Sequence, residues 1–163
     1  MAHLILGGIT IIVLILLSVQ DIRERMIFSF PVLTLSVAWL VYAVYLYYFR
    51  ILFFVAALGI TFAIFAALRV LSVWGDGDSD AYLLLAAVLL CCVDIKNVQH
   101  FMFLQSISIV ASLIVALLVG LIESLICKKK LHKHSDIAVI QGIAVVLIGV
   151  IVYGSLNRLG VIV

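Results

Sequence analysis

Acidic side chains that could carry out acid–base chemistry lie beside the apolar runs of this chain. Five of the eight Asp and Glu residues form two groups, one directly after the first apolar run and one directly before the fourth: Asp21 and Glu24, then Asp76, Asp78 and Asp80. Carboxylates close to membrane depth are costly and usually functional. Two carboxyl groups that share a site can carry out the two proton transfers of peptide hydrolysis. One accepts a proton from water, and the other donates a proton to the substrate. Such chemistry needs no metal and no nucleophilic side chain.

The second acidic group alternates with glycine in the segment 75–80. Gly75 and Gly77 permit a sharp turn with close backbone approach, after which a short helix can begin. The positive end of that helix would tolerate the carboxylates. A simpler interpretation is that these are N-capping acids in an aqueous loop, and Asp21 alone could be a solvated loop acid that pairs with Arg23 or Arg25.

Composition identifies the elements that must position these acids. Apolar residues make up 67% of the 163 residues and charged residues 11%, which excludes a soluble protein. The mean hydropathy is +1.43. About 20 helical residues cross a bilayer, and continuous Leu/Ile/Val/Ala/Phe runs lack the alternation of barrel strands. We therefore expect an all-α, polytopic membrane protein that forms one domain over 1–163. Six helices are predicted, at about 4–20, 31–49, 51–73, 80–93, 101–126 and 137–156.

The fourth of these runs, 81–93, is too short to span a bilayer alone, so its polar flanks must be sheltered by other helices. The distribution of Lys and Arg predicts which ends share a side, because positive loops stay cytoplasmic. The ends after the first, third and fifth spans carry most of them: Arg23, Arg25, Arg69, Lys128, Lys129, Lys130 and Lys133. The other side holds Arg50, Lys96 and Arg158. We expect a cytoplasmic-membrane protein with both termini outside and both acidic groups at the cytoplasmic face.

The remaining polar features predict no further chemistry. The net charge of +2 does not indicate a nucleic-acid partner, and the cysteines have no C-x-x-C spacing, so no metal and no cofactor is expected. Arg69 either snorkels to the interface or pairs with an acid of the 75–80 segment. The basic run 128–134 sets topology and contacts membrane lipid. Four tyrosines near the outer end of the second span suggest an interfacial belt: Tyr42, Tyr45, Tyr47 and Tyr48.

Two motifs give the chain a resemblance to a known family. Asp21 is followed by Arg23, Arg25 and Ile27, and the later segment Gly75-Asp76-Gly77-Asp78 is a G-x-G-D sequence. Together they resemble the type IV prepilin peptidases and the related archaeal preflagellin peptidases, which are six-span GxGD aspartyl proteases. The resemblance implies that Asp21 and Asp78 are the catalytic pair and that Gly75 and Gly77 support the catalytic loop.

The chain also departs from that family at several positions. Phe28-Ser29 replaces the common Pro-Asn, Asp80 replaces a lysine, and the Pro-rich segment before the last span is absent. These differences concern substrate preference more than reaction type. Because the Cys pairs of the zinc-binding domain of bifunctional members are absent, no N-methyltransferase activity is expected.

The expected function is therefore an aspartic-type endopeptidase that removes the cytoplasmic leader of a prepilin-like precursor. The expected partner is a protein with a basic leader and a hydrophobic helix, and Glu24, Asp76 and Asp80 are expected to attract that leader. Two alternatives remain open. The same acids could be proton sites of a small proton-coupled transporter, or the chain could be a pilus-assembly scaffold without chemistry.

Overall fold

The structure, a computed structural model, describes residues 2–24, 29–70, 75–127 and 139–161, except for the side chains of 22–24, 76 and 123–127. Every regular element in these ranges is helical, as predicted. The elements are α1 (Ala2–Glu24), α2 (Ser29–Leu46), the 3-10 turn η1 (Tyr48–Arg50), α3 (Ile51–Val70), α4 (Asp76–Cys92), α5 (Val98–Cys127) and α6 (Val139–Arg158). All except η1 and α4 are long and apolar enough to cross a membrane. The chain is a multi-pass membrane protein.

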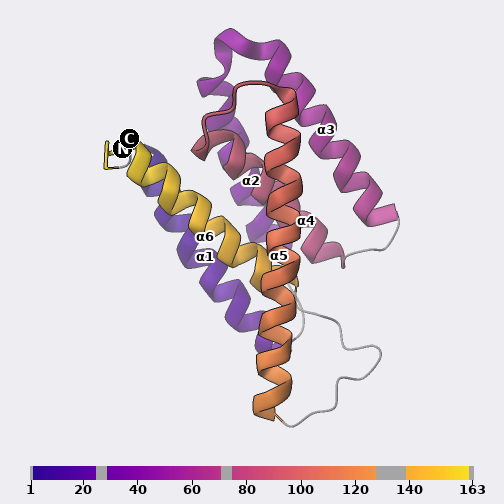
Figure 1. The fold of residues 1–163 in the computed structure, drawn as a ribbon. Coiled ribbons are helices and arrows are strands. Elements are labelled where there is room, and N and C mark those ends of the chain that lie inside the picture. The colour runs from indigo at the N-terminus through magenta and orange to yellow at the C-terminus, as the bar shows by residue number, and fades with distance from the viewer. Residues whose placement is uncertain (1, 25–28, 71–74, 128–138, 162–163) are drawn as a thin grey trace.

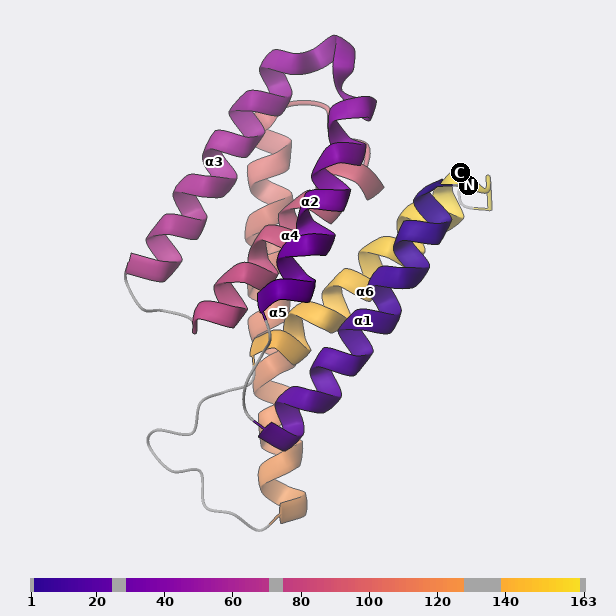
Figure 2. The same ribbon diagram turned by 180° about the vertical axis from the view of Figure 1, so that it is seen from behind.

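Successive helices run in alternating directions, so the bundle has two distinct ends (Figure 1). One, which we call the termini end, holds the beginning of α1, the η1 turn, the connection between α4 and α5, and the end of α6. The other, the aspartate end, holds the end of α1 and the beginning of α4 (Figure 2). This arrangement agrees with the predicted grouping of helix ends. Which end faces the cytoplasm remains a prediction.

The short helix α4 lies at the centre of the bundle. It packs against α2, α3, α5 and α6. Its side chains from Ser79 to Cys92 are buried, with Leu83 only partly covered. A helix that is apolar on all sides is stable when it is surrounded by other helices. The prediction that the polar flanks of this run are sheltered holds only in part: Asp80 is buried and Asp78 half-buried, whereas Asp94 and Lys96 at the other end are exposed.

Side chains from other elements satisfy the main-chain carbonyls at the end of α4. The last four carbonyls of any helix lack partners within it. Tyr47 Oη donates to the Leu90 oxygen over 3.0 Å, and an Arg158 nitrogen donates to the Cys91 oxygen over 2.8 Å. Burial raises the pKa of the Tyr47 hydroxyl above its ordinary value of 10.0, so the donor keeps its proton. These contacts allow α4 to end at Cys92, below the length of a full span.

The predicted tyrosine belt is only partly present. Tyr45 and Tyr48 are exposed, as expected for interfacial anchors. Tyr42 and Tyr47 are half-buried instead, because each hydroxyl forms a hydrogen bond within the bundle, Tyr42 with Arg158 and Tyr47 with the end of α4.

Glycines bring α6 very close to its neighbours. A Cβ on Gly142 would collide with the carbonyl oxygen of Ser112 and would lie 2.8 Å from its carbonyl carbon. A Cβ on Gly154 would lie 2.7 Å from Cβ of Cys92. Small residues at helix interfaces permit such close backbone approach where van der Waals packing has to replace the hydrophobic effect. These two glycines set the distances from α6 to α5 and to α4.

Candidate active site

Asp21 lies on the face of α1 that is directed into the bundle. The buried residues of this helix recur every three or four positions: His3, Gly7, Thr10, Leu14, Leu17 and Asp21. This spacing is one face of a helix. Asp21 is 5% exposed and its Oδ2 atom is buried. The carboxylate therefore continues the packing face of α1, whose neighbours are α6 and α2, and does not lie on a lipid-facing side.

Asp78 lies in the first turn of α4. The residue before this helix, Gly75, has extended backbone angles of φ −62° and ψ 160°. Its carbonyl accepts hydrogen bonds from the Ser79 nitrogen at 3.0 Å and the Ser79 hydroxyl at 3.1 Å. Asp78 is half-buried, and its Oδ1 atom is buried. Carboxylates in a first turn are stabilised by the positive end of the helix dipole.

The predicted boundary of the fourth helix was wrong by four residues. The sequence predicted a glycine turn over 75–80 followed by a helix from 80, whereas α4 begins at Asp76. Gly77 is its second residue, and the only glycine with positive φ among the described residues is Gly160. First-turn acids are favourable at a helix N-terminus, so the acidic segment extends the helix instead of preceding it. Of the two glycines in this segment, only Gly75 therefore occupies a non-helical position.

The other predicted site residues have different environments. Asp80 is 5% exposed and belongs to the buried part of α4. The side chains of Glu24 and Asp76 lie outside the described set, as do Arg25, Ile27 and the basic run 128–134. The predicted attraction of a leader by Glu24, Asp76 and Asp80 stays a prediction.

The structure places the two candidate catalytic aspartates at one end of the bundle. Asp21 is in the last turn of α1 and Asp78 in the first turn of α4 (Figure 1). The main packing partners of α1 are α6 and α2, and both of these also pack against α4. Helices α2 and α6 therefore connect the two helices that carry the aspartates.

Two buried polar residues at or near this end were not singled out from the sequence. Tyr82 is fully buried, and it follows Asp78 by four positions, so both occupy the same face of α4. Gln141 is 7% exposed in the first turn of α6, and its Oε1 has no hydrogen-bond partner among the described residues. The four-residue spacing was a usable signal for Tyr82. Gln141 could have been noticed as an isolated amide in an apolar run.

Arg69 is exposed at the end of α3, with its guanidinium carbon 5.8 Å from the centre of the Phe65 ring. This position fits a side chain that reaches the interface. No group of three His, Cys, Asp or Glu side chains in the described part of the chain could hold a metal ion.

Comparison with known proteins adds no relative. A scan against protein-family models and searches of curated proteins and solved structures found no match to this chain.

Proposed function

We propose that this protein is a membrane aspartyl endopeptidase that cleaves the leader of a prepilin-like precursor, with Asp21 and Asp78 as its catalytic pair. The observation that carries the proposal is the placement of both residues at one end of the bundle, on helices that share α2 and α6 as packing partners. The G-x-G-D motif and the D-x-R segment add the resemblance to a family with this activity.

The proposed chemistry follows from two carboxyl groups in different protonation states. The ionised aspartate accepts a proton from a water molecule, whose oxygen attacks the carbonyl carbon of the scissile peptide. The protonated aspartate donates its proton to the carbonyl oxygen. The aspartate that took the proton of water then gives it to the nitrogen, the C–N bond breaks, and a hydroxyl of the tetrahedral intermediate returns a proton to the other aspartate. Both carboxyl groups that the proposal uses are at least half-buried, Asp21 more deeply than Asp78.

The proposed substrate class is supported by the position of Asp78 at the beginning of a short helix. Asp78 lies in the first turn of a helix of 17 residues, about 25 Å long, inside a bundle whose α5 has 30 residues. A peptide bond that reaches Asp78 must belong to a segment that enters the bundle at the membrane surface. A precursor with a short basic leader followed by a hydrophobic helix has this property.

The test is cleavage of a leader-bearing precursor by purified protein in which Asp21→Asn or Asp78→Asn has been introduced. Each variant should lose at least about 1,000-fold in rate, since each removes one proton-transfer group. The matched control is Asp94→Asn, which alters an exposed aspartate at the termini end and should cleave at the wild-type rate. Cleavage by either site variant at close to the wild-type rate would exclude the two-aspartate mechanism. Proton-coupled flux in protein that leaves the precursor intact would favour the transporter alternative.

A further inference from the structure

Two arginines flank the end of α4 at the termini end, and each is held on one side by neutral groups. Arg50 donates to the carbonyl oxygens of Ile95 at 3.3 Å and Lys96 at 2.7 Å. Its guanidinium carbon lies 5.0 Å from the centre of the Phe53 ring. These contacts fix the position of the guanidinium without neutralising its charge.

Arg158 reproduces this arrangement from the last residue of α6. It donates to the carbonyl oxygen of Cys91 at 2.8 Å and to the Tyr42 hydroxyl. Its guanidinium carbon lies 5.6 Å from the centre of the Tyr42 ring. An aromatic ring face and a main-chain carbonyl therefore orient each arginine, one from the η1 turn and one from α6.

Among the described side chains at this surface, positive charge exceeds negative charge. The described contacts of both guanidiniums are with neutral groups, and Lys96 adds a third exposed cation. The exposed Asp94 is the one acidic side chain in the 93–97 connection. The end of α4 contributes only about half a negative charge from its carbonyls. A guanidinium has five N–H donors, so each arginine keeps donors beyond those used inside the bundle.

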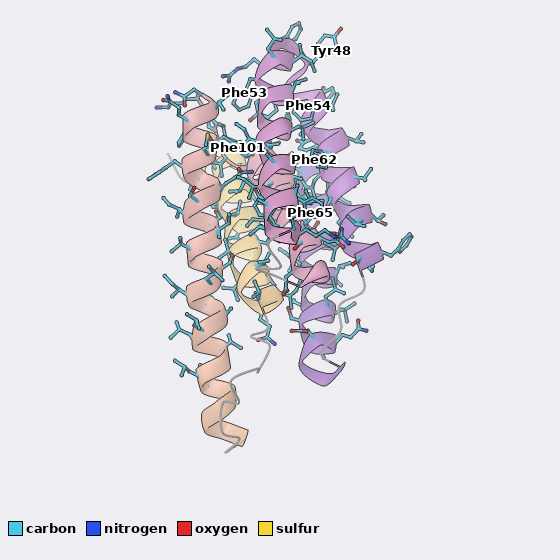
Figure 3. All side chains as sticks on the ribbon, turned by 90° about the vertical axis from the view of Figure 1, so that its right-hand side faces the viewer. Tyr48, Phe53, Phe54, Phe62, Phe65 and Phe101 are labelled. Carbon is cyan, nitrogen blue, oxygen red and sulfur yellow. The ribbon has the colours of Figure 1, made fainter. Side chains whose placement is uncertain are left out.

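The surface lies at the level of a membrane interface. Arg50 is in the first turn of the span Tyr48–Val70, and Arg158 is the last residue of the span Val139–Arg158. Beside Arg50 are the aromatic side chains of the α2–α3 connection, where Tyr48 is 71% and Phe49 95% exposed. Figure 3 shows Tyr48 together with Phe53 and Phe54 at this end. Aromatic residues occupy the headgroup level of a bilayer.

We propose that Arg50 and Arg158, assisted by Lys96, bind the phosphate of an anionic phospholipid headgroup at the termini end. Guanidinium groups match phosphate oxygens with paired hydrogen bonds, and anionic lipids attract basic residues at the membrane surface. A phospholipid is the occupant because its acyl chains would lie along the exposed apolar face beside the same residues. The proposal is independent of the proteolytic function, since it concerns the opposite end of the bundle.

The test compares the whole protein in nanodiscs of phosphatidylcholine with and without phosphatidylglycerol, with retained lipid measured by native mass spectrometry. The wild-type protein should retain phosphatidylglycerol in preference to phosphatidylcholine. The double variant Arg50→Gln/Arg158→Gln should bind phosphatidylglycerol about 30-fold more weakly, which corresponds to about 1 kcal/mol for each basic residue. Arg69→Gln removes the same charge from a ring-stacked arginine at the other end of α3 and should keep the wild-type preference.

Three outcomes would overturn the proposal. Equal retention of the two lipids by the wild-type protein would show that the surface does not select negative charge, and this arm requires no variant. Unchanged preference in the double variant would exclude these arginines. If inorganic phosphate added to phosphatidylcholine nanodiscs raised the thermal stability of the protein as much as phosphatidylglycerol does, the site would be assigned to a soluble anion. If the double variant does not fold, Arg50→Lys/Arg158→Lys keeps the charge and should bind phosphatidylglycerol more weakly than the wild type, with phosphatidylcholine binding unchanged.

Discussion

The indole nitrogen of Trp39 donates a hydrogen bond of 2.9 Å to the hydroxyl oxygen of Thr10 and thereby joins α2 to α1. Both residues are fully buried, and the Thr10 hydroxyl itself donates to the Leu6 carbonyl at 2.8 Å. This hydrogen bond links α1, which carries Asp21 in its last turn, to α2, the next helix in the sequence.

Replacing Thr10 by valine should destabilise the bundle. The change keeps the shape of the side chain but leaves the Trp39 N–H without its acceptor. An unsatisfied buried donor costs about 1 to 2 kcal/mol, and an average hydrogen bond between helices in a membrane protein contributes about 0.6 kcal/mol, so the expected loss lies between these values. A lower midpoint of thermal unfolding in detergent, with altered tryptophan emission, would be the expected result.

Thr34→Val is the matched control for this change. The Thr34 hydroxyl also donates to the carbonyl four residues earlier, Phe30, but it is exposed. Its loss should leave the unfolding midpoint almost unchanged. Equal destabilisation by the two variants would mean that the hydrogen bond to the indole contributes nothing.

Gly142→Ala should disrupt the packing of α6 against α5. The new Cβ would collide with the Ser112 carbonyl oxygen and approach the Ala116 nitrogen to 3.0 Å, and these are backbone atoms that cannot rotate away. Overpacking of this kind costs about 1 to 3 kcal/mol or more. Gly149→Ala, in the same helix with nothing within 4 Å of the added carbon, should be neutral or slightly stabilising. Similar unfolding midpoints for the two variants would argue against the close approach of α5 and α6.

Tyr47→Phe should destabilise the protein in a pH-dependent manner. The hydroxyl donates to the Leu90 carbonyl, and burial raises its pKa above the ordinary value of 10.0. A pKa raised by folding gives stability that is fully present below the unfolded value and is lost as pH rises through the folded value. The difference in unfolding free energy between wild type and Tyr47→Phe should therefore be constant below about pH 10 and shrink above it. A difference that grows with pH would contradict this assignment.

Hydropathy predicted the number of helices, their alternating direction and the enclosed position of α4. In lipid, the polar backbone groups of these apolar segments are satisfied when the segments are helical. The inward direction of Asp21 was also readable, since Leu14 and Leu17 precede it at helical spacing. The contact of Arg158 with the end of α4 and the contacts of Arg50 with the connection that follows α4 were not predicted. They join residues 45 and 67 positions apart in sequence, and only the packing of α2, α4 and α6 brings these together. The sequence showed these arginines only as loop charges.

The start of α4 changes what is expected of Asp80, and a pH profile of the proposed cleavage reaction tests it. In a glycine loop, Asp78 and Asp80 could approach each other, and their like charges would raise the apparent pKa of the catalytic pair. In the helix that begins at Asp76, residues two apart point in different directions, so this repulsion is weak. Asp80→Asn, which keeps the size of the buried side chain, should move both limbs of the profile to lower pH by less than about half a unit. Asp80→Lys is a poorer test, because it would place an ammonium group at a position that is only 5% exposed. A shift of about one unit or more with Asp80→Asn would show that the two carboxylates face each other and that the acidic segment is a loop in the working protein.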